Sequence, residues 1–314
     1  MTSAALKIVV SLHVASSVYQ RAEARAAQVA GQRHGYQVNV IFAEGDAVTQ
    51  SEQLLKLIYA TEEARPDVII LEPIGTSMVR VAQEAAKAGV GWIVLNREVA
   101  YIAELRASSR APMFAVTTDH MESGRIQGKQ LNALLPNGGT VVYLEGPSGH
   151  PVVQARKEGM LATKNPQIKI RPLHGQWQES VATEVMASWL KVPASRESCP
   201  RVVAAQNDFM AMGARKAFQS VAGRASQGGA EKVRYIGCDG LEDHGRRWTC
   251  GGLLDATIVC PPLSALAIEV LARELQEGVP AKPLTLAEPV SFPTLDQLQP
   301  AWTPLVSSGH TREA

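Results

Sequence analysis

The sequence has little net charge and no long hydrophobic run. Its 31 lysine and arginine residues nearly balance 30 aspartate and glutamate residues, which leaves a formal net charge of +1. Bulk electrostatics therefore attract neither nucleic acid nor a membrane surface. The longest apolar runs, such as residues 68–71, have the length of a strand and fall far short of the ~20 residues of a membrane helix. We expect no nucleic-acid partner and no direct insertion into a membrane.

Motifs for metals and nucleotide cofactors are also missing. The histidines show no His-x-x-x-His spacing, and the cysteines form no Cys-x-x-Cys pair. No Gly-x-x-x-x-Gly-Lys phosphate loop is present, and no Gly-x-Gly-x-x-Gly follows the first expected strand. We therefore expect no metal and no cofactor. The cysteines, interpreted as free thiols with a disulfide as the alternative, are Cys199, Cys238, Cys250 and Cys260.

The segment from Gly146 to His150 is the nearest approach to a catalytic motif. It resembles a nucleophile elbow around Ser148, but its second glycine is misplaced and no histidine or aspartate partner is indicated. A plain β-turn is the simpler interpretation. We therefore expect that the protein is not an enzyme.

The first seven residues lead directly into a strand at residues 8–12, without the charged region, apolar region or cleavage site of a signal peptide. Two interpretations fit this beginning. The protein is periplasmic if a signal peptide has already been removed from it, and cytoplasmic otherwise.

Strand and helix patterns alternate along nearly the whole chain. Apolar runs typical of strands occur at residues 8–12, 38–42, 68–71, 93–95, 114–116, 140–144, 168–173, 202–205, 235–237 and 256–259. Segments with helical periodicity separate them. This βαβ rhythm predicts parallel sheets covered by helices.

The expected helices each have a face of small apolar residues. Ala22, Ala26 and Val29 would line one face of the first helix. The matching face of the third helix would consist of Val79, Ala82 and Ala86. We expect these faces to pack against the sheet.

A chain of 314 residues is long enough for two domains of ordinary size. A single sheet of ten or more parallel strands is improbable, so two doubly wound domains are the better solution. The two halves of the pattern meet near residues 116–119, and no low-complexity linker separates them. Two such domains would form a cleft between them.

The strand at residues 202–205 runs into a helix through Asn207 and Asp208. Side chains of this type cap helix N-termini, and the carboxyl ends of parallel strands are where open α/β sheets bind small molecules. We expect capping here, by Asp208 in particular. A ligand contact from Asn207 is the additional hypothesis.

Several motifs together resemble those of a known family. They are Gln206-Asn207-Asp208-x-Met210-Ala211-x-Gly213-Ala214, Ile236-Gly237-Cys238-Asp239-Gly240, Leu254-x-Ala256-Thr257-Ile258, Val94-Leu95-Asn96-Arg97 and Arg156-x-x-Gly159-Met160. Through these motifs, which are spread over nearly the whole chain, the sequence resembles the ribose-type periplasmic sugar-binding proteins and the effector domains of LacI-type repressors.

The resemblance implies an α/β fold of the type I periplasmic binding protein. This fold has two Rossmann-like doubly wound parallel-sheet domains joined by a three-crossing hinge. The N-terminal lobe would hold residues 1–117 and 261–290. The C-terminal lobe would hold residues 118–260 and 291–314, with the ligand cleft between the lobes.

The same resemblance implies a set of ligand-binding residues and no catalytic residue. Asn96, Arg97, Arg156, Asn207 and Asp239 would bind sugar hydroxyls, since guanidinium, amide and carboxylate groups supply the donors and acceptors that hydroxyls need. The complete expected set is Ser17, Tyr19, Asn96, Arg97, Arg156, Trp177, Asn207 and Asp239.

Alternatives remain for several members of this set. Asp239 could be a cap or turn residue, and Arg97 and Arg156 could form surface ion pairs. Tyr19 and Trp177 would stack on the sugar, whereas the alternative for Trp177 is a place in the core.

The resemblance implies non-catalytic binding of a small sugar or polyol, as the substrate-binding component of an ABC-type uptake system that docks on a membrane permease. The alternative is a ligand sensor for signalling or transcription control. Only about six residues precede the first strand, so DNA binding by this chain is not expected. Cys238 and Cys260 replace an aromatic and a polar residue of the family pattern, which leaves the identity of the sugar open.

Overall fold

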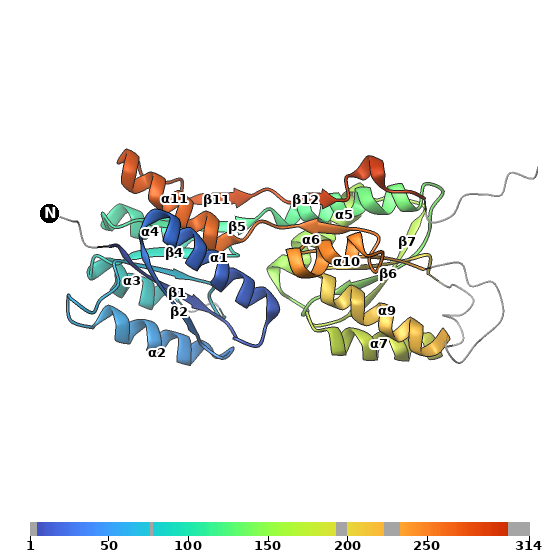
Figure 1. Cartoon of the computed structure of the whole chain (residues 1–314), viewed down its shortest axis with the longest axis horizontal. Coiled ribbons are helices and arrows are strands. Elements are labelled where there is room, and N and C mark those ends of the chain that lie inside the picture. Colours follow the sequence, from blue (N-terminus) through green and yellow to red (C-terminus); the bar gives the residue numbers. More distant parts are fainter. Residues whose placement is uncertain (1–4, 76–77, 193–199, 223–232, 301–314) are drawn as a thin grey trace, which may run out of the picture. The chain divides into compact units, whose positions relative to one another are not determined.

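The computed structural model describes residues 5–75, 78–192, 200–222 and 233–300, and Cys199 lies outside these ranges. The chain divides into two compact units. Unit 1 comprises Met1–Asp119 and Pro261–Glu288, and unit 2 comprises His120–Cys260 and Pro289–Ala314 (Figure 1). The chain therefore passes from one unit to the other three times, after Asp119, Cys260 and Glu288.

Unit 1 is built on a six-stranded parallel sheet with the strand order β11-β5-β4-β3-β1-β2. Its strands are β1(Lys7–Leu12), β2(Gln37–Phe42), β3(Val68–Leu71), β4(Gly91–Leu95), β5(Met113–Thr118) and β11(Leu284–Ala287). Ile8 of β1 pairs with Val38 on one side and with Val68 on the other. Because all six strands are parallel, their carboxyl ends lie along one edge of the sheet.

Helices cover both faces of this sheet. They are α1(Val18–His34), α2(Ala47–Ile58), α3(Val79–Lys87), α4(Tyr101–Ser108) and α11(Leu263–Glu277). Helices α1 and α11 pack on the face that carries Val10 and Phe114. Helices α2, α3 and α4 pack on the opposite face around Trp92, which is completely buried. Burial on both faces explains why these strands are continuous apolar runs in the sequence.

The predicted faces of two helices differ from the buried ones. Helix α1 buries Gln20, Glu23, Ala27, Ala30 and Gly31. Val29, from the predicted face, is 44% exposed. The cause is a buried carboxylate: Glu23 accepts hydrogen bonds from the backbone N–H groups of Leu263 and Ser264, at 3.1 and 2.8 Å, and so satisfies the N-terminus of α11. Hydropathy alone cannot predict a face that contains such a group.

In helix α3 only part of the predicted face is correct. Ala82 is fully buried, but Val79 is 36% exposed, and the core side consists of Val81, Ala82 and Ala85. Val79 is the first residue of the helix and does not belong to the core cluster on this face. Ala86, the third residue of the predicted face, is partly buried and packs against the same core.

Unit 2 has a four-stranded parallel sheet with the order β7-β6-β8-β9. Its strands are β6(Gly139–Glu145), β7(Ile168–His174), β8(Val202–Ala205) and β9(Arg234–Ile236). One face packs against α5(His120–Leu134) and α6(Pro151–Thr163), and the other against α7(Glu179–Lys191) and α9(Asp208–Ala222). A π-helix at Glu242–Arg246, α10(Arg247–Cys250) and a 3-10 helix at Leu295–Gln297 complete the helical elements of the described part of this unit.

The prediction that the sheets are parallel is wrong for one small ribbon. Strand β10(Thr257–Val259) pairs antiparallel with β12(Val290–Phe292), and β12 was not among the expected strands. Isolated parallel bridges also link β10 to the β9 segment, including one between Asp239 and Val259.

Among the described residues, no helix has both the length and the apolar character needed to cross a membrane.

Candidate functional site

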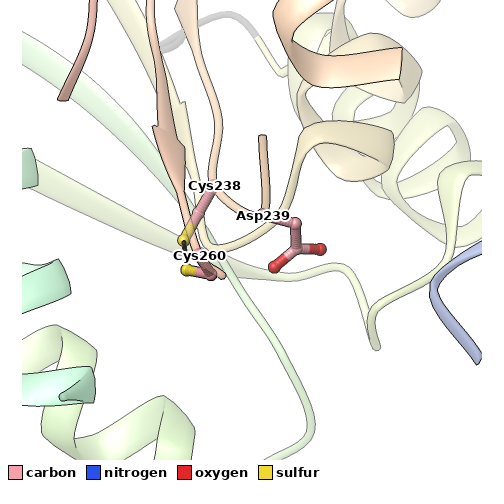
Figure 2. Close-up of side chains that lie close together, drawn as sticks. All are labelled: Cys238, Asp239 and Cys260. Carbon is pink, nitrogen blue, oxygen red and sulfur yellow. Dashed lines mark hydrogen bonds between the residues drawn. The ribbon is translucent and has the colours of Figure 1, made fainter. Parts of the chain in front are cut away.

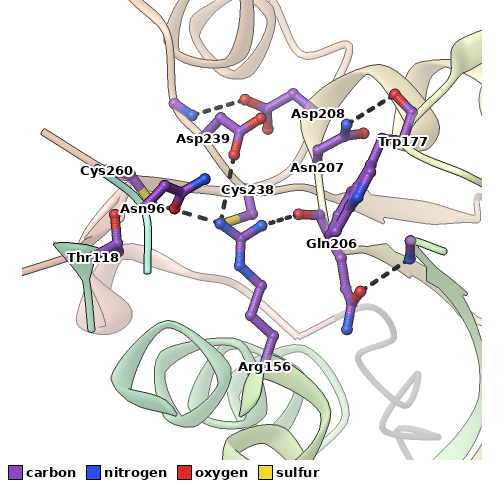
Figure 3. A network of polar contacts seen from close by, with 12 residues as sticks. Asn96, Thr118, Arg156, Trp177, Gln206, Asn207, Asp208, Cys238, Asp239 and Cys260 are labelled. Atoms are coloured by element: carbon purple, nitrogen blue, oxygen red, sulfur yellow. Dashed lines mark hydrogen bonds and ion pairs between the residues drawn. The ribbon is translucent and has the colours of Figure 1, made fainter. Parts of the chain in front are cut away.

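Arg156 is the centre of a polar network in unit 2. It lies on α6, the residue is 7% exposed, and its side chain donates a hydrogen bond to the carbonyl of Gln206. A second guanidinium nitrogen lies 3.7 Å from a carboxylate oxygen of Asp239. The guanidinium carbon lies 5.7 Å from the ring centroid of Trp177 (Figure 3). The structure thus brings together three of the sequence-predicted residues, and Arg156 contacts groups inside the unit instead of forming a surface ion pair.

Close packing between α5 and α6 fixes the position of Arg156. A Cβ atom on Gly159 would lie 2.1 Å from the carbonyl oxygen of Met121, and one on Gly124 would lie 2.1 Å from that of Arg156. Both distances are shorter than side chains tolerate, so only glycine permits this approach of the two backbones. The helix that carries Arg156 is held by these two glycines.

Asp239 follows β9 and sits in a tightly bonded turn. Its backbone N–H donates to Ile258 at 3.0 Å, and its carbonyl accepts from Cys260 at 3.1 Å. Its φ of 104° is unusual for a residue other than glycine. The helix that follows begins at Glu242, two residues beyond Gly240. Backbone bonds on both sides therefore aim the carboxylate of Asp239 toward Arg156.

The expectation that Asp208 caps helix α9 is wrong. Asn207 provides the cap, because its Oδ1 accepts from the N–H of Met210 at 2.8 Å. The carboxylate of Asp208 instead accepts from the N–H of Gly240 at 2.8 Å and from the hydroxyl of Thr257 at 2.6 Å. Its role is to brace the turn that carries Asp239.

Burial changes the chemistry of the Asp208 carboxyl. It is 1% exposed, and this burial raises its pKa well above the ordinary range, with a further upward effect from the negative charge of Asp239. The hydrogen bonds from Thr257 and Gly240 act in the opposite direction. Two neighbouring carboxyl groups thus have different environments, one enclosed and one facing Arg156.

Asn207 and Trp177 are joined by a direct hydrogen bond. The Nδ2 of Asn207 donates to the carbonyl of Trp177 at 3.2 Å, and Trp177 has a φ of 62°. The half-buried indole packs against the α7 and α9 core and meets the ring of His150 edge-on at 6.3 Å. Asn207 therefore combines the capping role with a place in the network.

Gln206 is a member of this network that sequence reasoning did not select. Its side chain is fully buried, donates to the hydroxyl of Tyr143 at 3.2 Å and to the carbonyl of Val153 at 2.9 Å, and accepts from Gly146 at 3.0 Å. It ties the ends of β6 and β8 to α6. Gln206 is the first residue of the Gln-Asn-Asp motif, so the sequence motif already contained this position.

In unit 1, Asn96 and Arg97 follow β4 at the carboxyl edge of the sheet. Asn96 has a φ of 61°, and its amide donates to a carboxylate oxygen of Glu72 at 2.9 Å. Arg97 donates to the carbonyl of Gly75 at 2.5 Å. Ser17 caps α1 by accepting a hydrogen bond from the N–H of Gln20. Tyr19, in the first turn of the same helix, is half-buried.

Two further residues of this edge were missed. Glu72 is 8% exposed, and its second oxygen accepts from the amide of Gln20 at 2.6 Å. The Oε1 of Gln20 in turn accepts from the N–H of His13 at 2.9 Å. Glu72 directly follows a buried strand, which is the signal that could have identified it. Glu72 and Gln20 thus fix the orientation of the Asn96 amide group.

The cysteines of unit 2 include a close pair. Cys238 and Cys260 place their sulfur atoms 3.9 Å apart, and one carboxylate oxygen of Asp239 lies within 4.8 Å of both (Figure 2). Cys250 is exposed. The prediction of free thiols is confirmed for these three cysteines. The spacing of 22 residues between Cys238 and Cys260 gave no sign of their proximity.

Each unit thus contains a set of predicted residues in the segments that follow its parallel strands, with Arg156 on α6 in unit 2. Guanidinium, amide, carboxylate and aromatic groups are all present. Fixed donors and acceptors beside an aromatic face can hydrogen-bond several hydroxyl groups and cover a C–H surface. The arrangement suits binding, and the polar groups are held in place by backbone and side-chain hydrogen bonds.

Comparison with known proteins assigns the family. The model of the periplasmic binding protein domain matches residues 8–278. The chain belongs to the periplasmic binding protein family. The two parallel-sheet units have the type I fold that the sequence predicted, and the family is one of binding proteins and not of enzymes, as expected. A search of curated proteins returned no match.

Solved structures with the same fold include several periplasmic proteins. An ABC transporter solute-binding protein from Actinobacillus succinogenes with bound D-allose is 25% identical, with a TM-score of 0.77, over 91% of this chain and 96% of that one. A Caulobacter myo-inositol-binding protein is 22% identical, with a TM-score of 0.74, over 91% and 92%. The fructose-binding periplasmic domain of a hybrid two-component system is 22% identical, with a TM-score of 0.72, over 91% and 90%.

Proposed function

We propose that the protein binds one molecule of a small sugar or polyol, which residues of both units contact. The observation that carries this proposal is the network of Arg156, Asp239, Asn207 and Trp177 in a member of the periplasmic binding protein family. A guanidinium and a carboxylate 3.7 Å apart present donors and an acceptor side by side. Adjacent hydroxyl groups of a sugar need both.

The unit 1 set supplies complementary groups. Asn96 and Arg97 offer amide and guanidinium donors, and Glu72 and Gln20 restrict the side chain of Asn96 to one orientation. A binding group whose orientation is fixed in advance loses less conformational entropy when the ligand binds. In this proposal Ser17 and Tyr19 flank the ligand from the loop between β1 and α1, and Trp177 covers a C–H face.

We place this activity in an ABC-type uptake system, with a membrane permease as partner and the periplasm as location. The family and the Actinobacillus protein, an ABC transporter component with bound D-allose, support this assignment. The second candidate is a ligand-sensing role. It is favoured by the likeness to the fructose-binding domain of a two-component system.

Calorimetric titration with a panel of pentoses, hexoses and inositols tests the binding proposal. We expect one member of the panel to bind with a stoichiometry of one. Amino acids and nucleobases serve as control ligands of similar size. The proposal is wrong if no polyol binds and one of these controls does.

A further inference from the structure

The pair Cys238 and Cys260 has no role in the proposed function. Cys238 follows β9 and Cys260 follows β10, in two segments joined by the bridge between Asp239 and Val259. We propose that Cys238 and Cys260 are a redox-active dithiol, which a small disulfide such as oxidised glutathione converts into an intramolecular disulfide.

The geometry requires only a small movement of the sulfur atoms. They lie 3.9 Å apart and would have to approach to the ~2.05 Å of a disulfide bond. The backbones that carry them are already held together, because the N–H of Cys260 donates to the carbonyl of Asp239 at 3.1 Å. We expect rotation of the two side chains to supply the approach.

Exposure assigns different roles to the two thiols. Cys238 is 1% exposed, whereas Cys260 is only partly buried. The hydrogen bond with Cys238 and the positive charge of Arg156 lower the pKa of Cys260, whereas its burial acts in the opposite direction. The same hydrogen bond and burial raise the pKa of Cys238. Cys260 is therefore the attacking thiolate, and Cys238 is the second thiol, which resolves the intermediate.

The reaction balances in two exchange steps. The Cys260 thiolate attacks one sulfur of oxidised glutathione, which breaks the S–S bond, forms a mixed disulfide and releases one glutathione thiolate. Cys238 then loses its proton to solvent and attacks the Cys260 sulfur, releasing the second glutathione. The two protein thiols are oxidised, and one molecule of oxidised glutathione is reduced to two thiols.

The surroundings favour a disulfide over a bound metal ion. The sulfur atoms pack with the apolar side chains of Ile126 and Ile258. The third available donor, the carboxylate of Asp239, faces the guanidinium of Arg156 at 3.7 Å. A cation bound there would disrupt this ion pair and lie close to a positive charge, whereas a disulfide is neutral and leaves the pair intact.

The test uses the full chain carrying Cys199→Ser and Cys250→Ser, so that only the two thiols remain. After incubation with oxidised glutathione in the presence of a chelator, we expect intact mass spectrometry to show loss of two hydrogen atoms, and thiol titration to fall from two to zero. Dithiothreitol should reverse both changes.

Single variants in this background test the assigned roles. Cys238→Ser should accumulate a stable glutathione adduct, because the resolving thiol is missing, whereas Cys260→Ser should remain unmodified. Cys238→Ala is the second variant in case a buried serine prevents folding, and circular dichroism monitors the fold of each. Persistence of two free thiols in the parent, or an adduct on Cys260→Ser, would overturn the proposal. So would tight zinc binding in native mass spectrometry that removes both thiols from titration without oxidant.

Discussion

Asp239 and Asp208 show how neighbouring carboxyl groups receive separate roles. The backbone of Asp239 is fixed by bonds to Ile258 and Cys260, and its carboxylate faces Arg156. The carboxylate of Asp208 is enclosed between Gly240 and Thr257, and its hydrogen bonds to them stabilise the turn that contains Asp239. The first is the one that the proposed function assigns to the ligand, whereas the second maintains the position of the first.

Replacement of Asp239 tests its assignment to the site. Asp239→Ala should weaken sugar binding by roughly tenfold to a hundredfold and leave the protein folded, because a lost hydrogen bond to a charged group costs ~1.5–3 kcal/mol. Asp239→Asn should have a smaller effect. Asp243→Ala, at an exposed position four residues further on, is the matched control in the calorimetric assay. Unchanged affinity and melting temperature in Asp239→Ala would make Asp239 a turn residue only.

His120, the first residue of α5, makes stability depend on pH. Burial lowers its pKa from 6.5 to about 2, with additional repulsion from Arg156 and His150. The unfolded chain takes up a proton below pH 6.5, but the native state does not until about pH 2. The contribution of His120 to stability is therefore complete above pH 6.5 and is lost as the pH falls, by up to ~1.4 kcal/mol per pH unit.

Urea unfolding at pH 7.5 and pH 5 measures this loss. His120→Gln should lose less stability between these two pH values than the wild type. His174→Gln is the control, since the His174 side chain is 53% exposed. Equal losses in the wild type and in His120→Gln would contradict the assignment.

At the scale of elements, the contact between α5 and α6 depends on glycine. Gly159→Ala would place a Cβ atom against the carbonyl of Met121, so the helices must separate. Overpacking of this kind typically costs ~1–3 kcal/mol, and the shift of α6 should also weaken sugar binding through Arg156. Urea unfolding and calorimetry measure the two effects.

Glu158→Ala is the control for that substitution. Glu158 is the exposed neighbour of Gly159 on the same helix, so its replacement should change stability by less than ~0.5 kcal/mol. If Gly159→Ala were as stable as this control and bound sugar equally well, the contact would not position Arg156.

The elements that the sequence predicted well are those buried on both sides. The strand at Val68–Leu71 is fully buried, and its uninterrupted apolar run leaves little alternative. Strand β11 was missed because it lies at the edge of its sheet, where Leu286 is 49% exposed and the apolar pattern is weak. The face of α1 was wrong because Glu23 serves a partner 240 residues away.

The candidate site was predictable in its residue types but not in its internal bonds. Asn96, Arg156 and Asp239 came from the family motifs. The bracing roles of Glu72 and Gln206 depend on long-range contacts, with Glu72 bonded to Gln20 and Gln206 to Tyr143. Such contacts are formed by the fold and leave no local pattern in the sequence.

At the scale of the whole molecule, the two units should respond together to the ligand. If residues of both contact the same sugar, binding links the units and restricts their relative motion. We expect the radius of gyration from small-angle scattering to decrease at saturating ligand. Asp239→Ala with the same sugar concentration should show a smaller decrease. Identical dimensions of the free and bound wild type would indicate a rigid, preformed site.

The discontinuity of unit 1 has a consequence for its biosynthesis. Strand β5 pairs with β11, and Glu23 satisfies the N-terminus of α11, yet both partners are translated only after residues 120–260. A nascent chain that has emerged only as far as Asp119 therefore exposes an unpaired strand edge and the part of its apolar surface that α11 later covers. Unit 1 can reach its native state only after residues 261–288 have been translated, and unit 2 needs β12, which pairs with β10 and is translated later still. Neither unit can therefore be completed before nearly the whole chain has been made.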